Sequence, residues 1–273
     1  GWRHHADAAR YGATVAAAID SVLAQTWPNL TRTLIDDGST DATAAILAGY
    51  TAGDRRIRRK TNRRNGGAIG GFQRAFWFGD ADYVLPKSAD DLIAPDFIAR
   101  TMEILLMHPN AAMCHAQGTV FRDGAAERAA YPASHALHAI GPDPVARARH
   151  VMAHYTSSPS FWGVYRRSAV DQLAPIRCRA GWDHAVLAEL ALDGEIRHVA
   201  APLYLRRDGG KPVLDLARAA TEQGMRGVAL DDVLGELRWR TPLSITAYAH
   251  LETFAAARLP AAERAALMRL AGE

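Results

Sequence analysis

Helix-like and strand-like segments alternate between residues 14 and 85, and this alternation constrains the fold more than any other feature of the sequence. Apolar residues recur at helical spacing in three segments, and short apolar runs lie between them. We predict helices at residues 14–25, 42–50 and 70–77, and strands at residues 30–35, 57–60 and 83–85. This order predicts an α/β fold in which helices flank a mostly parallel sheet.

The rest of the sequence shows less regular patterns until its C-terminal part. Proline and glycine interrupt residues 122–144. We predict a strand and turn at residues 159–170, a helix at residues 182–192 and a closing strand at residues 196–205. The pattern is almost wholly helical over residues 211–273, so we expect a helical extension after the α/β domain.

Composition places the chain among ordinary globular proteins. It has 273 residues, 49% hydrophobic and 22% charged, which suits one large domain. No apolar run is long enough to span a membrane, and the N-terminus lacks the apolar core of a signal peptide. The two cysteines, Cys114 and Cys178, have no CxxC partner, which disfavours a disulfide scaffold or thiolate zinc site. We therefore expect a cytoplasmic location.

Seven basic residues lie between positions 55 and 64, although the formal net charge is only +3. This basic cluster has two interpretations: a solvated loop beside a strand, or an electropositive rim that attracts phosphates. No recognised motif and no interleaved aromatic residues accompany it. We therefore expect no nucleic-acid partner.

Acidic residues follow two of the predicted strands. Asp36 and Asp37 end one strand, and the run Ser88-Ala89-Asp90-Asp91 follows another. Ligands of such sheets bind at the carboxyl ends of the strands. Either cluster alone equally fits a helix cap, but both together at strand ends indicate a binding site.

Several segments together resemble the family 2 glycosyltransferases, which have the GT-A fold. The segment AIDSVLAQTWPNLTRTLIDDGSTDAT resembles the family's opening helix, second strand and Asp-Asp-Gly-Ser turn, and it is the most specific match. The other matching segments are Asn65-Gly66-Gly67 with Gln73-Arg74, YVLPKSADDLIAPDFI, GVYRRSAV, WDHAVLAELALDG and LYLRRDGG. The resemblance implies a GT-A domain over residues 1–210, with a nucleotide-sugar-binding half (1–118) and an acceptor-side half (119–210).

The resemblance also implies a donor and a metal. The donor would be a nucleotide-diphosphate sugar, either a UDP-sugar or a dTDP-sugar, and Mg²⁺ or Mn²⁺ would neutralise its diphosphate. Asp90 matches the family's metal-binding carboxylate, while Asp91 either orients the metal's water shell or caps the next helix. Asp36 or Asp37 would accept a hydrogen bond from the base or ribose, the other serving as a helix cap. Ser88 stands where the family usually has an aspartate that touches the ribose.

Asn65 falls in the family's Asn-x-Gly segment, and we predict it among the donor-binding residues. An asparagine before Gly66-Gly67 is also ordinary turn chemistry, and that is the favoured interpretation of this position.

For catalysis, the resemblance places the general base at Asp183. It would take the proton from an acceptor hydroxyl in a single displacement that inverts the anomeric carbon. His184 is the competing candidate because its unperturbed pKa is better placed, and an N-cap is the structural alternative for Asp183. Arg206 and Arg207 would reach the diphosphate, or one of them would pair with Asp208.

The sequence departs from the family at its start. Members begin with a buried strand that ends in a Pro-x-Tyr-Asn turn, whereas GWRHHADAARYG shows no strand pattern. We expect either a fragment lacking that strand or an unusual N-terminus, with backbone groups beside it that need another partner. The absence of a Gln-x-x-Arg-Trp motif favours a non-processive enzyme.

The acceptor is expected to be a glycan, a lipid-linked glycan or a small molecule, as in bacterial polysaccharide biosynthesis. The helices after residue 210 carry apolar faces and offer a peripheral contact with the inner face of the membrane, or with a second copy of the chain. These faces include Leu230, Val233, Leu234 and Leu237. Two rival functions remain: a catalytically silent GT-A-like nucleotide-binding or assembly subunit, and a sugar-phosphate nucleotidyltransferase. The second would need a glycine-rich phosphate loop near the N-terminus.

Overall fold

β5 (Ala111–Phe121) forms the centre of the larger sheet. Most of its residues are buried, because helices cover both faces of the sheet. A strand buried on both sides reads as an apolar run without alternation, and this explains why residues 111–121 were not predicted as a strand. β5 pairs in parallel with β8 (Glu195–Arg207) and in antiparallel with β7 (Gly163–Arg166).

The computed structural model describes residues 8–124, 128–131, 136–155, 158–176, 182–208 and 260–272. The other strands are β1 (Arg32–Asp36), β2 (Ile57–Thr61), β3 (Tyr83–Val84), β4 (Leu92–Ile93) and β6 (Arg128–Ala130). The helices are η1 (Ala8–Ala13), α1 (Val15–Leu23), α2 (Thr43–Gly53), α3 (Gly67–Trp77), α4 (Phe97–Met107), α5 (Pro144–His154), η3 (Ser158–Phe161), α6 (Arg167–Val170), α7 (Trp182–Asp193) and α11 (Ala261–Gly272).

The strands form two sheets, and the prediction of a mostly parallel sheet is wrong. Among the described residues, β1 and β2 form a parallel two-stranded sheet, and the larger sheet has the order β3-β7-β5-β8-β4 with β6 beside β5. In the larger sheet only β5 and β8 are parallel; the other pairs are antiparallel. β1 and β2 are joined through α2, as a parallel pair requires, whereas β3, β4, β6 and β7 each pair in antiparallel with a strand of the larger sheet.

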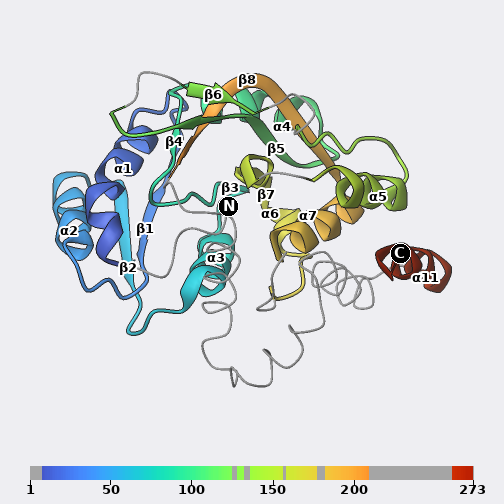
Figure 1. The fold of residues 1–273 in the computed structure, drawn as a ribbon, viewed down its shortest axis with the longest axis horizontal. Coiled ribbons are helices and arrows are strands. Elements are labelled where there is room, and N and C mark those ends of the chain that lie inside the picture. Colours follow the sequence, from blue (N-terminus) through green and yellow to red (C-terminus); the bar gives the residue numbers. More distant parts are fainter. Residues whose placement is uncertain are drawn as a thin grey trace.

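β1 pairs with β2 along one edge, and no other strand in the described part of the chain pairs with it. α1 and α2 flank this small sheet at one side of the molecule (Figure 1). Leu34 of β1 packs against a small core made by Val15, Ile19 and Leu47. The two helices predicted here are therefore confirmed, and they pack on one face of the pair of strands.

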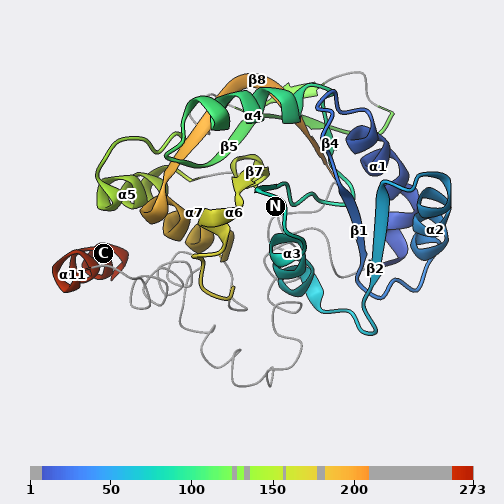
Figure 2. The ribbon, with the colours of Figure 1, turned by 180° about the vertical axis from the view of Figure 1, so that it is seen from behind.

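Helices cover the larger sheet on both faces. Figure 2 shows α4 lying across β5 and β8, with Phe97 and Leu105 fully buried against that face. Phe76 of α3 and Leu187 of α7 are buried in the core on the opposite side. Leu267 of α11 is buried in the same core, and α11 packs beside α5. The rest of the predicted helical extension, with its apolar faces, lies outside the described residues.

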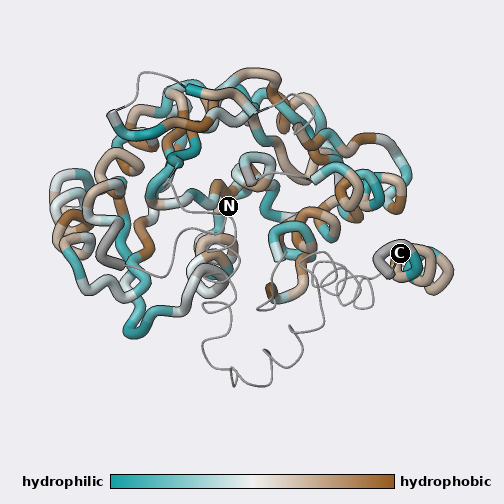
Figure 3. The backbone as a smooth tube through the Cα atoms, in the orientation of Figure 1, coloured by the Kyte–Doolittle hydropathy of each residue, from teal (hydrophilic) through white to brown (hydrophobic). Residues whose placement is uncertain are grey.

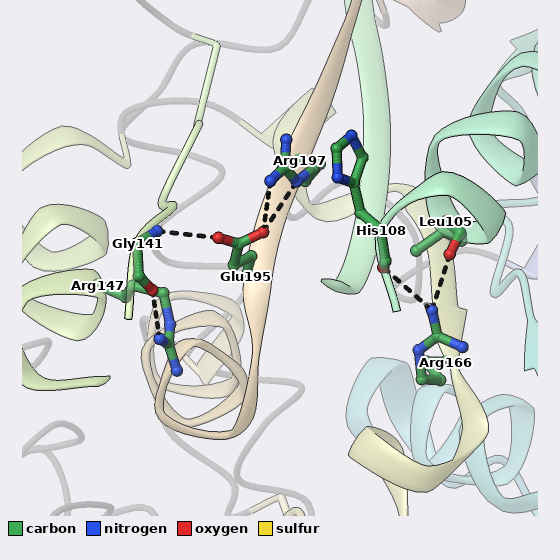
Figure 4. Close-up of polar contacts among 7 residues, drawn as sticks. All are labelled: Leu105, His108, Gly141, Arg147, Arg166, Glu195 and Arg197. Atoms are coloured by element: carbon green, nitrogen blue, oxygen red, sulfur yellow. Dashed lines mark hydrogen bonds and ion pairs between the residues drawn. The ribbon is translucent and has the colours of Figure 1, made fainter. Parts of the chain in front are cut away.

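A buried arginine joins α5 to the end of α7. The guanidinium of Arg147 donates to the carbonyl oxygens of Ala191 and Leu192, at 2.8 and 3.1 Å, and to that of Gly141 at 2.7 Å. It thereby satisfies carbonyls that the helix end leaves without a partner. Glu195 opens β8 and accepts from the backbone of Gly141 (Figure 4). These contacts fix the start of the strand that carries Arg206 and Arg207 at its other end.

Arg166 has the same role at the end of α4. Its guanidinium donates to the carbonyl oxygens of Leu105 and Ala111, both at 2.9 Å, and to that of His108 (Figure 4). β7 is thus tied to the turn between α4 and β5. Neither arginine was predicted to have a structural role, because each acts on carbonyls far away in the sequence.

Candidate active site

The acidic run after β3 folds into a buried loop. Ser88, Asp90 and Asp91 are all buried. The ammonium group of Lys87 donates to the backbone oxygen of Ser88 at 3.1 Å and to that of Asp91. Burial lowers the pKa of Lys87 to about 8, although Asp91 and Asp90 oppose this effect. A lysine thus closes the loop that carries both carboxylates.

Asp91 anchors this loop to β8. One oxygen accepts from the hydroxyl of Tyr204 at 2.5 Å, and the other accepts from the backbone nitrogen of Arg207 at 2.8 Å. Burial and the charge of Asp91 raise the pKa of Tyr204 well above its usual range. Asp91 does not cap the next helix, since α4 begins at Phe97 with Asp96 at its N-cap.

Asp90 lies beside Asp91 with a different set of partners. The hydroxyl of Ser88 donates to its carboxylate, and the Nε of Arg207 donates to its backbone oxygen at 2.9 Å. Tyr11 of η1 lies close to this loop: burial, then the charges of Asp90 and Asp91, raise the pKa of its phenol. The sequence therefore placed Ser88 and Asp90 correctly together, but it gave no sign of Tyr11.

Asp36 and Asp37 divide their roles. Asp36 is buried and accepts from the backbone nitrogen of Ser39 at 2.9 Å, so it stabilises the turn after β1. Asp37 is half-buried and accepts from the backbone of Gly66 at 2.9 Å and from Asn62 at 2.6 Å. Neither aspartate caps the following helix, because α2 has Ala42 at its N-cap; the helix-cap alternative is therefore wrong, and Asp36 holds the turn instead.

Asn65 has the turn geometry that its sequence context indicates. Its side-chain oxygen accepts from the backbone nitrogen of Gly67 at 2.7 Å, at the start of α3. The turn after β1 packs against it: Gly38 has a φ of +76°, and a Cβ there would lie 3.2 Å from the Asn65 nitrogen. Glycine is required at this position by both the backbone conformation and the close approach.

The segment from Tyr11 to Thr14 lies between the two acidic clusters. The backbone nitrogen of Gly12 donates to Asp41, in the turn after β1, at 3.3 Å. The hydroxyl of Thr14 donates to the backbone oxygen of Ala89 at 3.4 Å. The structure thus brings both clusters to one region, as their positions at strand ends predict.

Arg206 and Arg207 leave β8 beside the acidic loop. Arg207 lies over the ring of Phe121 at 4.8 Å and pairs with Asp123. Arg206 donates to the hydroxyl of Tyr131. Asp208, the predicted surface partner, pairs with Arg122 at 2.7 Å. Both arginines are therefore fixed by protein contacts at the edge of the loop.

Asp183 lies in the first turn of α7, and its carboxylate contacts Tyr155. The hydroxyl of Tyr155 donates to Asp183 Oδ2 at 2.7 Å, and the backbone nitrogen of His184 donates to Oδ1 at 2.9 Å. Burial raises the pKa of Tyr155, as does Asp183, while Arg206 opposes them. Asp183 and Arg206 therefore both lie near Tyr155.

The residues at the acidic loop fit a divalent cation that binds together with a diphosphate. No group of three or more His, Cys, Asp and Glu side chains arranged for a metal occurs in the described ranges. Mg²⁺ and Mn²⁺ are hard cations that take oxygen ligands, and Mg²⁺ is usually held by one or two carboxylates and substrate phosphates. Asp90 supplies such a carboxylate, whereas the oxygens of Asp91 accept from Tyr204 and Arg207.

The basic cluster spans β2, so much of it forms an exposed strand and not the predicted solvated loop beside a strand. Arg58, Arg59 and Lys60 are exposed, Arg56 pairs with Asp54 at 2.7 Å, and the segment is hydrophilic in Figure 3. The cluster ends beside the turn of Asp37.

Sequence reasoning missed the tyrosines and the lysine that hold these side chains. Lys87, Tyr131, Tyr155 and Tyr204 each contact a predicted site residue. Lys87 had a local signal, because a lysine beside two carboxylates is an obvious partner. The tyrosines had none, since their partners lie 28 to 113 positions away in the sequence.

An α/β fold with acidic loops and arginines at one end of its strands is typical of enzymes that handle nucleotide sugars. The sequence profile described as glycosyl transferase family 2 matches residues 9–173. The chain therefore belongs to glycosyl transferase family 2 and is a glycosyltransferase. The comparison with curated proteins gave no match.

Solved structures share the fold at low sequence identity. S. aureus TarS 1–349 has a TM-score of 0.58 and 16% identity, with 92% of this chain and 70% of that chain covered. The same protein in complex with UDP-GlcNAc has a TM-score of 0.59 and 14% identity, with 96% of this chain and 77% of that chain covered. The mannosyltransferase PcManGT from Pyrobaculum calidifontis, in complex with GDP-Man and Mn²⁺, has a TM-score of 0.53 and 14% identity. All of this chain (100%) and 78% of that chain are covered. These similarities confirm the GT-A class of fold.

Among the described helices, none combines the length and the apolar character needed to cross a bilayer.

Proposed function

We propose that the chain transfers a sugar from a nucleotide-diphosphate sugar to an acceptor hydroxyl, with inversion at the anomeric carbon. The observation that carries this proposal is a pair of carboxylate sites on different elements: the acidic loop, which Asp91 ties to β8, and Asp183, which accepts from the hydroxyl of Tyr155. The arrangement suits a reaction in which one end of the site holds a diphosphate and the other removes a proton. TarS in complex with UDP-GlcNAc and PcManGT in complex with GDP-Man support a donor of this class.

The donor is expected to bind the half formed by residues 1–118. Asp37, in the turn after β1, and Asn65, just before α3, lie where the base and ribose are expected. Asp90, with Ser88 beside it, would hold the divalent cation, Mg²⁺ or Mn²⁺. When bound with the diphosphate, this cation supplies positive charge that stabilises the leaving group. PcManGT in complex with Mn²⁺ supports a metal at such a site.

The acceptor is expected to bind between residues 119 and 210. Asp183 takes the proton from the acceptor hydroxyl as that oxygen forms a bond to the anomeric carbon. The bond between that carbon and the diphosphate oxygen breaks, and the nucleoside diphosphate leaves with the electron pair. Arg206 and Arg207 are placed to stabilise the negative charge that develops on the diphosphate.

His184 is less suited to be the base than Asp183. Its Nε2 lies 3.2 Å from the backbone oxygen of Tyr155. A carbonyl only accepts hydrogen bonds, so Nε2 is the donor and only Nδ1 could take a proton. Burial lowers the pKa of His184, which makes the imidazole a weaker base, although Asp183 opposes this effect.

The proposal is tested by donor turnover with water as the acceptor. The protein is incubated with Mn²⁺ or Mg²⁺ and a panel of UDP-, dTDP- and GDP-sugars, and the release of nucleoside diphosphate is measured. We expect metal-dependent release that falls by about 100-fold or more in Asp183→Asn. Asp171→Asn, which changes an exposed aspartate outside the site, is the control.

Release that persists in Asp183→Asn would contradict its role as the base. Absence of release with every donor, while UDP still binds, would favour the silent nucleotide-binding subunit. Formation of a nucleotide sugar from a sugar phosphate and a nucleoside triphosphate would favour the nucleotidyltransferase.

A further inference from the structure

Tyr155 follows the last turn of α5 and contacts both candidates for the general base. Its hydroxyl donates to Asp183 Oδ2 at 2.7 Å, and its backbone oxygen lies 3.2 Å from Nε2 of His184. The two rings meet edge to face, with centroids 4.9 Å apart. One residue therefore sets the orientation of both the carboxylate and the imidazole.

These contacts give the two side chains different chemical roles. The imidazole donates through Nε2 to the backbone oxygen of Tyr155 and so helps to hold that part of the backbone in place. The carboxylate accepts from the phenol and from the backbone nitrogen of His184, on different oxygens. Hydrogen bonds to a carboxylate favour its charged form, which is the form that accepts a proton.

We propose that Tyr155 is a positioning residue for the reaction: its hydroxyl aims the Asp183 carboxylate by donating a hydrogen bond to its charged form. This inference rests on the proposed function, in which Asp183 is the base. The charged and titratable groups that act on Tyr155 or share this pocket are Asp183 and His184 of α7, Tyr165 of β7 and Arg206 of β8. No other described tyrosine has its hydroxyl bonded to Asp183.

Tyr155→Phe tests the proposal because it keeps the ring and removes the donor. In donor hydrolysis, we expect kcat to fall about tenfold with little change in the KM for the donor, since the hydroxyl contacts the base and not the donor side. The acid limb of the kcat profile should move to higher pH, because the charged carboxylate has lost a hydrogen bond.

Tyr165→Phe is the matched control. Tyr165 is also buried, and its hydroxyl donates to the backbone oxygen of Phe161 instead of the carboxylate. Its loss should lower stability without moving the pH profile. A merely structural Tyr155 would give the same result, so equal profiles for the two variants would overturn the proposal.

A second measurement does not depend on turnover. The carboxyl carbon of Asp183 is followed by ¹³C NMR across pH, with Asp183→Asn used for assignment. Its titration should move to higher pH in Tyr155→Phe and not in Tyr165→Phe. Coincidence of the Tyr155→Phe and wild-type titrations would refute the contact. A shifted titration in a protein without any donor turnover would instead contradict the proposed function alone.

Wild-type protein labelled with 3-fluorotyrosine covers the case in which Tyr155→Phe does not fold. The ¹⁹F resonance of Tyr155 should titrate together with the Asp183 carboxyl carbon. It should lose that response in Asp183→Asn. A ¹⁹F resonance of Tyr155 that does not shift as the Asp183 carboxyl group titrates would overturn the proposal, and this test does not require a substitution of Tyr155.

Discussion

Asp90 and Asp91 are neighbours of the same type, yet the structure gives them different sensitivities to substitution. Replacing Asp91 with alanine removes the acceptor of the Tyr204 hydroxyl and of the Arg207 backbone nitrogen. Each buried donor left without a partner costs about 1 to 3 kcal/mol. The loss also leaves Lys87 and Arg207 with less compensating charge. Breaking a buried ionic arrangement costs about 3 to 5 kcal/mol, and we expect Asp91→Ala to destabilise the fold by that amount.

Asp90→Ala should cost about 1 to 3 kcal/mol, less than Asp91→Ala, because it removes the acceptor of the buried Ser88 hydroxyl but also one of two adjacent like charges, and it leaves the links to β8 intact. Urea unfolding of both variants, followed by circular dichroism and tryptophan fluorescence, measures the difference. Asp91→Asn should fall between them, since an amide oxygen replaces one acceptor. Equal losses for Asp90→Ala and Asp91→Ala, or a loss below about 1 kcal/mol for Asp91→Ala, would refute the division of roles.

Two further predictions concern the core. Burial and the neighbouring His198 lower the pKa of His115 from 6.5 to about 4, so His115 contributes stability that is complete above pH 6.5 and is lost as the pH falls toward 4. At pH 5 the protonation of His115 accounts for a loss of about 2 kcal/mol in the free energy of unfolding. In urea unfolding at pH 7 and pH 5, His115→Gln should therefore lose about 2 kcal/mol less than the wild type between the two pH values. An unchanged pH dependence in His115→Gln would contradict this prediction. A Cβ on Gly163 would lie 2.5 Å from the Cys114 oxygen, so Gly163→Ala should lower stability in urea unfolding by about 1 to 3 kcal/mol or more. Gly49→Ala, in a helix with nothing within 4 Å, should raise stability by about 0.5 to 1 kcal/mol, and equal effects of the two alanines would contradict the packing argument.

Local patterns in the sequence predicted local structure well. The helices around α1, α2, α3 and α7, and the strands around β1, β2 and β8, were each expected within a few residues of their bounds. The turn roles of Asp36 and Asn65 also follow from short-range hydrogen bonds to Ser39 and Gly67. These features depend on neighbours in the chain, which a sequence pattern records.

Features set by distant partners were not predictable. β5 has no periodicity because both of its faces are buried, and the direction of strand pairing depends on the connections between strands. Asp91 meets Tyr204 across 113 positions, and Tyr155 meets Asp183 across 28. The sequence identified the carboxylates of the candidate site, whereas only the fold shows which groups hold them.

We propose that Asp90 binds a nucleoside diphosphate through a divalent cation. Calorimetric titration with UDP, with and without Mn²⁺, of the wild type, Asp90→Asn and Asp96→Asn measures this binding. Asp96 is a suitable control because its side chain is 47% exposed and lies in the turn before α4. We expect Mn²⁺-dependent binding that weakens by about tenfold or more in Asp90→Asn and is unchanged in Asp96→Asn. UDP binding that is independent of Mn²⁺, or equally tight in Asp90→Asn, would contradict the claim.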